Sequence, residues 1–188
     1  MAIKFFIVLI ASFVSTTLNA QTKFSQNSYL DLGYSSISYY DGIYSRKPNA
    51  LRMIYGQNST ENIGWEGLLG LGLTTDNAAG VNSGNTVGVK VPVTFGLYTK
   101  IYIKPNNSFE IFGRAGWASI SRDWTCTGST CANPGITEKI VVSSFSYGAG
   151  LKLNLSKNFA LTTDYMSYYN RDGISFNATS IGTSYGFN

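Results

Sequence analysis

Residues 62–75 read NIGWEGLLGLGLTT and decide the fold. Successive side chains of a β-strand point to opposite faces, so this stretch has one apolar face and one face that holds Glu66. The apolar face carries Ile63, Trp65, Leu69, Leu71 and Leu73. The face of Glu66 is otherwise glycine and small polar residues, with Leu68 the exception. A carboxylate buried in apolar surroundings is unfavourable without a partner. Glu66 therefore needs a polar interior.

Alternation of this kind recurs along the chain, and helical periodicity is absent. The 13 Tyr, 11 Phe and 20 Gly against only 4 Pro also favour β-structure. A chain of 188 residues is long enough for one domain. We expect eight strands, at residues 28–40, 49–57, 62–75, 86–103, 109–122, 139–155, 159–170 and 174–187.

The connections between these strands alternate in length. QNSTEN, KPNNS and SKN are short, whereas DGIYSRKPN, DNAAGVNSGN and residues 123–138 are longer, and only the last hairpin, NRDG, breaks the pattern. Short turns at one end and long loops at the other are typical of bacterial outer-membrane barrels. The fold class we predict is all-β, an eight-stranded antiparallel up-and-down transmembrane β-barrel.

Charged residues support this assignment through the face they occupy. Nine lie inside the expected strands, where residues of the same parity are mostly small or polar: Asp31, Arg52, Glu66, Lys90, Lys100, Glu110, Arg114, Lys152 and Asp164. The opposite parity carries no charge and includes Leu30, Leu32, Tyr34, Leu51, Met53, Tyr55, Val87, Val89, Val91, Val93, Phe95, Leu97, Ile111, Trp117, Phe145, Tyr147, Leu151, Leu153, Leu161, Tyr165 and Ile181. We expect the nine charged residues to form an ion-pair network in the lumen, with the apolar face toward lipid.

Two soluble folds are the alternatives. A β-sandwich would place the charged parity in water, but such a face is usually rich in Lys, Glu, Thr and Gln rather than in Gly, Ala and Ser. A lipocalin-like barrel would have the reverse polarity, apolar inside. Aromatic residues also gather near both ends of the strands, as at two membrane interfaces. We place Tyr55, Trp65, Phe109 and Phe159 near the short turns, and Tyr34, Tyr39, Tyr40, Trp117, Trp124, Tyr168 and Tyr169 near the long loops.

The first twenty residues are typical of a cleaved export signal. Lys4 precedes an apolar run over residues 5–14, and Ala20 offers a small residue at the cut. A retained anchor is the alternative. We therefore divide the chain into a signal peptide, residues 1–20, and a barrel domain, residues 21–188, and expect it in the outer membrane of a bacterium.

Cysteine and histidine usage limits the chemistry. Cys126 and Cys131 lie in TCTGSTCANPG, and in an exported chain this spacing predicts a disulfide that closes a loop. A redox pair or half of a metal site is the alternative, but the spacing is not CxxC. The chain contains no histidine, so we expect no zinc site, no other metal or cofactor and no serine–histidine catalysis. A net charge of +4 is too small to predict nucleic-acid binding.

Three segments resemble the small OmpA-like and opacity-type outer-membrane barrel family. They are FEIFGRAGWA at 109–118, YGAGLKLNLSKNFALTTDYMSYY at 147–169 and the closing TSYGF. The pattern of alternating strands resembles that of this family over essentially the whole mature chain. It implies that Tyr185 and Phe187 form the signal that the barrel-insertion machinery reads, although Asn188 follows where the family usually ends on the aromatic residue.

Eight strands enclose a lumen that side chains can fill. We therefore expect a plugged barrel with a structural or surface-interaction role, with a narrow porin as the alternative and a lipid-modifying enzyme as a weaker one. Expected partners are outer-membrane lipid, including lipopolysaccharide, the insertion machinery, and a host or surface ligand at loops that expose Tyr44, Arg46, Lys47, Asn77, Asn82 and Asn85. The turn near Thr60 predicts Glu66 opposite Ile54, which places Arg52 diagonally beside Glu66 on the neighbouring strand. Arg114 could instead reach Glu66 across the lumen.

Overall fold

The computed structural model describes residues 28–79, 84–129, 131 and 134–187, and these form eleven strands. The expected signal peptide and Asn82 lie outside the described residues. The strands are β1 (Ser28–Tyr40), β2 (Ser45–Arg46), β3 (Asn49–Asn58), β4 (Ile63–Gly72), β5 (Thr75–Ala79), β6 (Thr86–Lys90), β7 (Val93–Asn106), β8 (Phe109–Thr127), β9 (Thr137–Asn154), β10 (Phe159–Arg171) and β11 (Ile174–Phe187).

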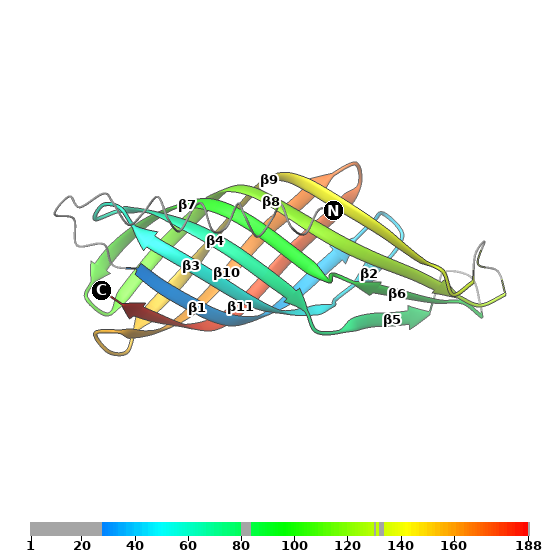
Figure 1. Cartoon of the computed structure of the whole chain (residues 1–188), viewed down its shortest axis with the longest axis horizontal. Coiled ribbons are helices and arrows are strands. Elements are labelled where there is room, and N and C mark those ends of the chain that lie inside the picture. Colours follow the sequence, from blue (N-terminus) through cyan, green and yellow to red (C-terminus); the bar gives the residue numbers. More distant parts are fainter. Residues whose placement is uncertain (1–27, 80–83, 130, 132–133, 188) are drawn as a thin grey trace, which may run out of the picture.

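Eight of these strands close into an antiparallel barrel (Figure 1). Each pairs with its neighbour in the order β1, β3, β4, β7, β8, β9, β10 and β11, and β11 returns to β1 through thirteen residue pairs from Ser28↔Phe187 to Tyr40↔Ser175. Full closure leaves the barrel wall without an open edge. The predicted eight-stranded barrel is confirmed.

The two ends of the barrel differ as the connections predict. Short turns join β3 to β4, β7 to β8 and β9 to β10 at the end where β1 begins and β11 finishes, which we call the short-turn end. At the opposite, long-loop end, only β10 and β11 are joined tightly. Asp172 and Gly173 both have positive φ there, 55° and 76°, as the two central residues of a type I′ hairpin turn require.

One predicted strand is wrong in a way that changes which residues face inward. Residues 86–103 do not form one strand, because β6 ends at Lys90 and β7 begins at Val93. Pro92 has no N–H to give to a ladder and fixes its own φ, so the chain breaks at Val91 and Pro92. The break reverses the alternation. Val87, Val89 and Val91, which we expected at the lipid face, are buried, whereas Val93 is 42% exposed.

Beyond the barrel rim, part of the wall continues as a separate sheet. β6 pairs with the far end of β8 through Thr86↔Thr127 to Lys90↔Asp123, β5 pairs with β6, and β9 accompanies β8 as far as Thr125↔Thr137. We call β5, β6 and the outer ends of β8 and β9 the protruding sheet. It extends well past the other strands at the long-loop end (Figure 1).

The exposed face of the barrel wall is apolar. Trp65, Trp117 and Phe145 are each at least 56% exposed, as lipid-facing side chains of an isolated barrel would be. Four residues expected in the aromatic belts are placed differently. Trp124 and Tyr169 are partly buried against the interior cluster. Tyr39 and Tyr168 are buried inside. Both have the same parity as a charged residue of their strand, Asp31 and Asp164, and parity sets the direction of a side chain. In the described part of the chain, no helix is long and apolar enough to cross a membrane.

Candidate functional site

The interior near the short-turn end holds a continuous chain of ion pairs. Arg52 contacts Asp31 at 2.7 Å and also Asp164, Arg114 contacts Asp164 at 2.7 Å and also Glu66, and Lys100 contacts Glu110 at 2.6 Å. Lys100 lies 4.0 Å from Glu66 and so joins the two parts. Acids and bases alternate along this chain, and every member is at most 4% exposed. The arrangement compensates charges that would otherwise be costly to bury.

Arg114 connects opposite sides of the lumen. From β8 it donates Nε and Nη2 to the Glu66 carboxylate of β4 and Nη1 to Asp164 of β10. A planar guanidinium has five donors in a fixed geometry, which suits it to bind two carboxylates at once. Glu66 also accepts a hydrogen bond from the Tyr29 hydroxyl of β1. Asp31 accepts one from Thr162 Oγ1 at 2.6 Å.

A glycine makes room for Tyr29. Gly56 lies directly opposite Glu66 in the β3–β4 ladder. A β-carbon added at Gly56 would overlap the Tyr29 ring. The absence of a side chain at this position therefore lets the phenol lie beside the Glu66 carboxylate.

The predicted β3–β4 register is wrong by two residues. Glu66 pairs with Gly56, not with Ile54, because the turn is centred at Glu61, one residue later than Thr60, and the amides of both Ser59 and Thr60 donate to Ile63 O. The shift places Arg52 opposite Gly70, away from Glu66. Of the two candidate partners that the sequence left open, Arg114 is the one that contacts Glu66.

Two of the nine predicted charges do not take part in this chain of ion pairs, and one of the two lies outside the lumen. Lys152 faces the lumen, with its Nζ 4.8 Å from the Tyr29 ring centroid and 3.4 Å from Ser184 Oγ, but among the described residues it makes no ion pair. Lys90 lies on the protruding sheet beside Asp123, on the strand face opposite the buried Val89, because the break at Pro92 separates it from the barrel. Four acids and four bases then remain inside, and their formal charges cancel.

A second, apolar layer fills the lumen toward the long-loop end. Its core residues are almost fully buried: Ile37, Tyr39, Ile54, Leu68, Val89, Val91, Tyr98, Ile120, Met166, Tyr168 and Phe176. Tyr39 packs on Phe176 with ring centroids 4.9 Å apart. The lumen thus contains two groups of buried side chains, the paired charges and this apolar layer.

Sequence reasoning missed this layer and the tyrosines that support the charges. Ile37, Ile54 and Phe176 have the inward parity of their strands, so alternation contained the signal. A search for charge alone did not detect it. Leu68, noted as an exception beside Glu66, is the clearest instance, because it belongs to the apolar layer and is 1% exposed.

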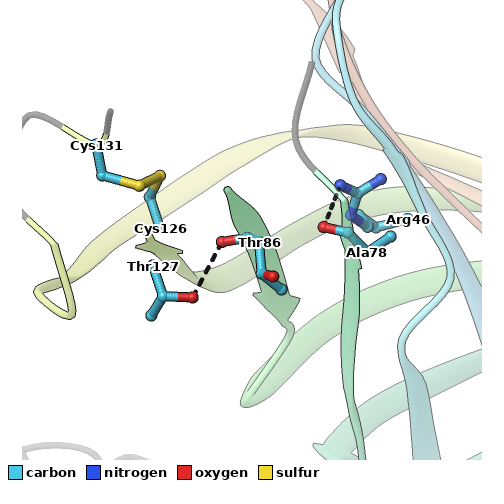
Figure 2. The surroundings of a disulfide bond; sticks show 6 residues. All are labelled: Arg46, Ala78, Thr86, Cys126, Thr127 and Cys131. Carbon is cyan, nitrogen blue, oxygen red and sulfur yellow. Dashed lines mark hydrogen bonds between the residues drawn. A yellow bond between two sulfur atoms is a disulfide. The ribbon is translucent and has the colours of Figure 1, made fainter. Parts of the chain in front are cut away.

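The tip of the protruding sheet is closed by a disulfide. Cys126 and Cys131 are bonded, as predicted, with their Cα atoms 5.9 Å apart. Figure 2 shows this bond near Thr127, whose Oγ1 donates to Thr86 O. Arg46, expected on an exposed loop, is instead 7% exposed. Its guanidinium donates to Val87 O of β6 at 3.2 Å and to Ala78 O of β5 at 3.4 Å. Figure 2 shows the bond to Ala78.

Tyr185 and Phe187, the predicted insertion signal, lie on β11 with their side chains outward. Tyr185 pairs with Phe159 and is 54% exposed, and Phe187 lies 6.3 Å from the ring of Tyr55. Their recognition by the insertion machinery stays a prediction. Over the described residues, no group of three or more His, Cys, Asp or Glu side chains could hold a metal ion.

A closed barrel of eight antiparallel strands, apolar outside and charged inside, defines a small barrel of the bacterial outer membrane. Residues 6–187 match the model of the outer membrane protein beta-barrel domain, and the chain belongs to this family. It is therefore a small outer-membrane β-barrel protein. In this class the short turns face the periplasm, which places the protruding sheet at the cell surface.

Solved structures of other outer-membrane proteins share the fold. Ail, the attachment invasion locus protein of Yersinia pestis, crystallised with the heparin analogue sucrose octasulfate, is 17% identical with a TM-score of 0.60 over 87% of this chain and all of Ail. Neisserial surface protein A is 10% identical with a TM-score of 0.64, over 85% of this chain and 97% of its own. The N-terminal barrel of Pseudomonas aeruginosa OprF is 16% identical with a TM-score of 0.53, over 86% and 98%. No curated protein sequence matches this chain.

Proposed function

We propose that the protein is a surface-interaction protein, whose sealed barrel holds the protruding sheet outside the cell, and not a pore or an enzyme. The observation that supports this proposal is the burial of both the paired charges and the apolar layer inside the barrel. A conducting porin needs a continuous aqueous path, whereas Ile54, Leu68 and Met166 are each at most 1% exposed. Binding is commonly carried by loops on a rigid scaffold.

The protruding sheet offers an edge to a partner. β10 pairs with β9 only from Asn154 to Tyr147, whereas β8 continues beside β9 as far as Thr137. Among the described residues, the outer part of β9 therefore pairs with a strand on one side only, and it contains Val141, which is 69% exposed. Open edges of this kind accept an added strand. We infer that an extended segment of a host or envelope protein is the partner. The attachment role in the name of Ail is consistent with this inference.

Conductance tests the sealed barrel. Purified protein in planar bilayers should give no steady current, and Glu66→Gln and Arg114→Gln should leave it silent because the apolar layer stays closed. A steady wild-type conductance that changes in either variant would favour the narrow porin. Unaltered lipid A and phospholipids in mass spectra of an expressing strain are expected as well, and a new lipid species would favour the enzyme.

Adherence tests the exposed edge. A non-adherent bacterial strain that expresses the protein should bind cultured host cells or immobilised matrix protein. Val141→Lys should reduce this binding, because a charge at an edge opposes strand addition. Val141→Thr is the matched control and should retain binding, since it keeps a β-branched, uncharged residue at the same position. Equal binding of both variants would contradict a role for this edge.

A further inference from the structure

A cavity of about 270 Å³ opens on the inner side of the protruding sheet, above the apolar layer. The residues around it come from β8, from the start of β9 and the residue before it, and from the loop after β1. They are Asp41, Tyr44, Arg122, Trp124, Cys126, Ile136 and Glu138.

Arg122 supplies a fixed cation in this cavity. Its Nη1 donates to the Tyr39 hydroxyl, and its guanidinium carbon lies 5.4 Å from the Tyr39 ring centroid. Tyr39 is itself fully buried. A guanidinium has five donors, and over the described residues only Nη1 has an acceptor, while Nε is buried without one. The Nη2 hydrogens and the second Nη1 hydrogen remain for an acid group in the cavity.

The nearest carboxylate does not occupy these donors. Asp41 accepts from the amides of Ile43 and Tyr44 at 3.1 and 2.7 Å and from the Tyr39 hydroxyl at 2.8 Å. Asp41 therefore holds its own loop in place. Glu138 lies opposite Trp124 across the β8–β9 ladder and, within the described chain, forms no ion pair with Arg122. The negative charges of Asp41 and Glu138 at the cavity disfavour a ligand with two acid groups.

The other walls favour a flat apolar body. Trp124 and Tyr44 present aromatic surface, and Ile136 adds aliphatic surface. Arg46 lies 5.4 Å from the centroid of the Tyr44 ring and so supports it from outside the cavity walls. Aromatic rings stack with planar groups at little entropic cost. A volume of about 270 Å³ is at the small end for ligand pockets, which suits one or two fused rings.

We propose that this cavity binds a small aromatic monocarboxylate, with its acid group on Arg122 and its rings against Trp124 and Tyr44. This site is separate from the edge of β9, and either proposal can fail without the other.

Isothermal titration of 2-naphthoate and of its neutral amide, 2-naphthamide, into the protein in nanodiscs tests the site. Empty nanodiscs correct for partition of the rings into lipid. The acid should bind the wild-type protein at least about tenfold more tightly than the amide, because hydrogen bonds to charged groups are the stronger ones. These titrations of the wild-type protein are sufficient to overturn the proposal. Equal affinity for the acid and the amide, or no binding of either, would do so.

Variants locate the binding. Arg122→Gln should lose the preference for the acid. Arg171→Gln, the same change at an exposed position at the end of β10, should keep it. Glu138→Gln should bind the acid as tightly as wild type or more so. If Arg122→Gln still preferred the acid as strongly as Arg171→Gln, the site would lie elsewhere.

Discussion

Arg114 is the residue on which the charged layer most depends. It is 4% exposed and contacts two carboxylates, Glu66 and Asp164, from strands on either side of its own. Each carboxylate has one further cation, Lys100 at 4.0 Å for Glu66 and Arg52 for Asp164. These secondary contacts cannot replace a guanidinium that binds both acids.

Arg114→Leu is therefore expected to lower the free energy of unfolding by about 3 kcal/mol or more, since removal of one partner leaves buried charge uncompensated. Urea titration of the protein in detergent, followed by tryptophan fluorescence, measures the change. Arg171→Leu, at an exposed end of β10, is the control and should shift stability by about 0.5 kcal/mol or less. If Arg114→Leu lowered the free energy of unfolding as little as Arg171→Leu, the ion pairs of Arg114 would not stabilise the barrel as expected.

Lys100 and Glu110 should behave as a coupled pair. Their contact is 2.6 Å, and both residues are buried. Lys100→Met alone leaves Glu110 without its cation, and Glu110→Gln alone leaves Lys100 with the more distant Glu66.

The double variant should then lose less stability than the sum of the single variants, with a coupling of about 1–3 kcal/mol. The same urea titrations of wild type, both single variants and the double variant give this value. Strict additivity would show that the pair does not interact.

The sequence could indicate which residues face inward, but not which of them pair. Eight of the nine predicted charges face the lumen because parity along a strand is a local property. The partner of Glu66 depends on register, and a difference of two residues in the β3–β4 register places Arg52 away from it. The pairing of Arg114 with Asp164 crosses 50 residues of sequence and depends on how the barrel closes.

At the scale of elements, the break at Val91 and Pro92 shows how one residue redirects a strand. Alternation continues through Val87, Val89, Val91 and Val93 in the sequence, so the pattern alone predicts a single strand. Pro92 was the available signal, because proline is disfavoured inside a central strand. β6 could then join the outer part of β8, which extends the sheet beyond the barrel.

The disulfide should stabilise this protruding sheet and not the barrel. Cys126 pairs with Val87 of β6, whereas the barrel strands close through other ladders. Replacement of Cys126 and Cys131 by serine should cost about 2 kcal/mol locally, for the loss of a small closed ring.

Hydrogen exchange by mass spectrometry measures this effect. Peptides that cover β6 and the outer ends of β8 and β9 should exchange faster in the double serine variant, while peptides of β1 and β11 should not change. Faster exchange throughout the barrel would show that the disulfide has a wider role.

At the scale of the whole molecule, closure makes the barrel a single stable unit. The protein in an outer-membrane fraction should therefore migrate differently in SDS gels before and after boiling, because a barrel that resists SDS stays compact until it is heated. The variant without the disulfide should keep this shift. An unshifted wild-type band would contradict the expected stability.

Closure also explains why the overall fold was predictable and the interior less so. The number of strands, their direction and the lipid-facing side follow from alternation and loop length, which each segment carries by itself. The division of the lumen into a charged and an apolar layer requires that Ile54, Leu68 and Phe176, from three different strands, join one cluster. Which residues meet is set by the stagger between strands, which no single segment encodes.

The alternating chain of charges has a consequence for the order of events during membrane insertion. Its members come from six strands, and Arg52 reaches Asp164 across 112 residues of sequence. A partly inserted chain that held only β1 to β4 would expose Asp31, Arg52 and Glu66 to hydrocarbon without Asp164 or Arg114. Such a half-built sheet is unstable in lipid, and its open edges add unpaired backbone groups. We therefore expect the eight strands to assemble before the sheet enters the hydrocarbon, so that insertion and closure occur together.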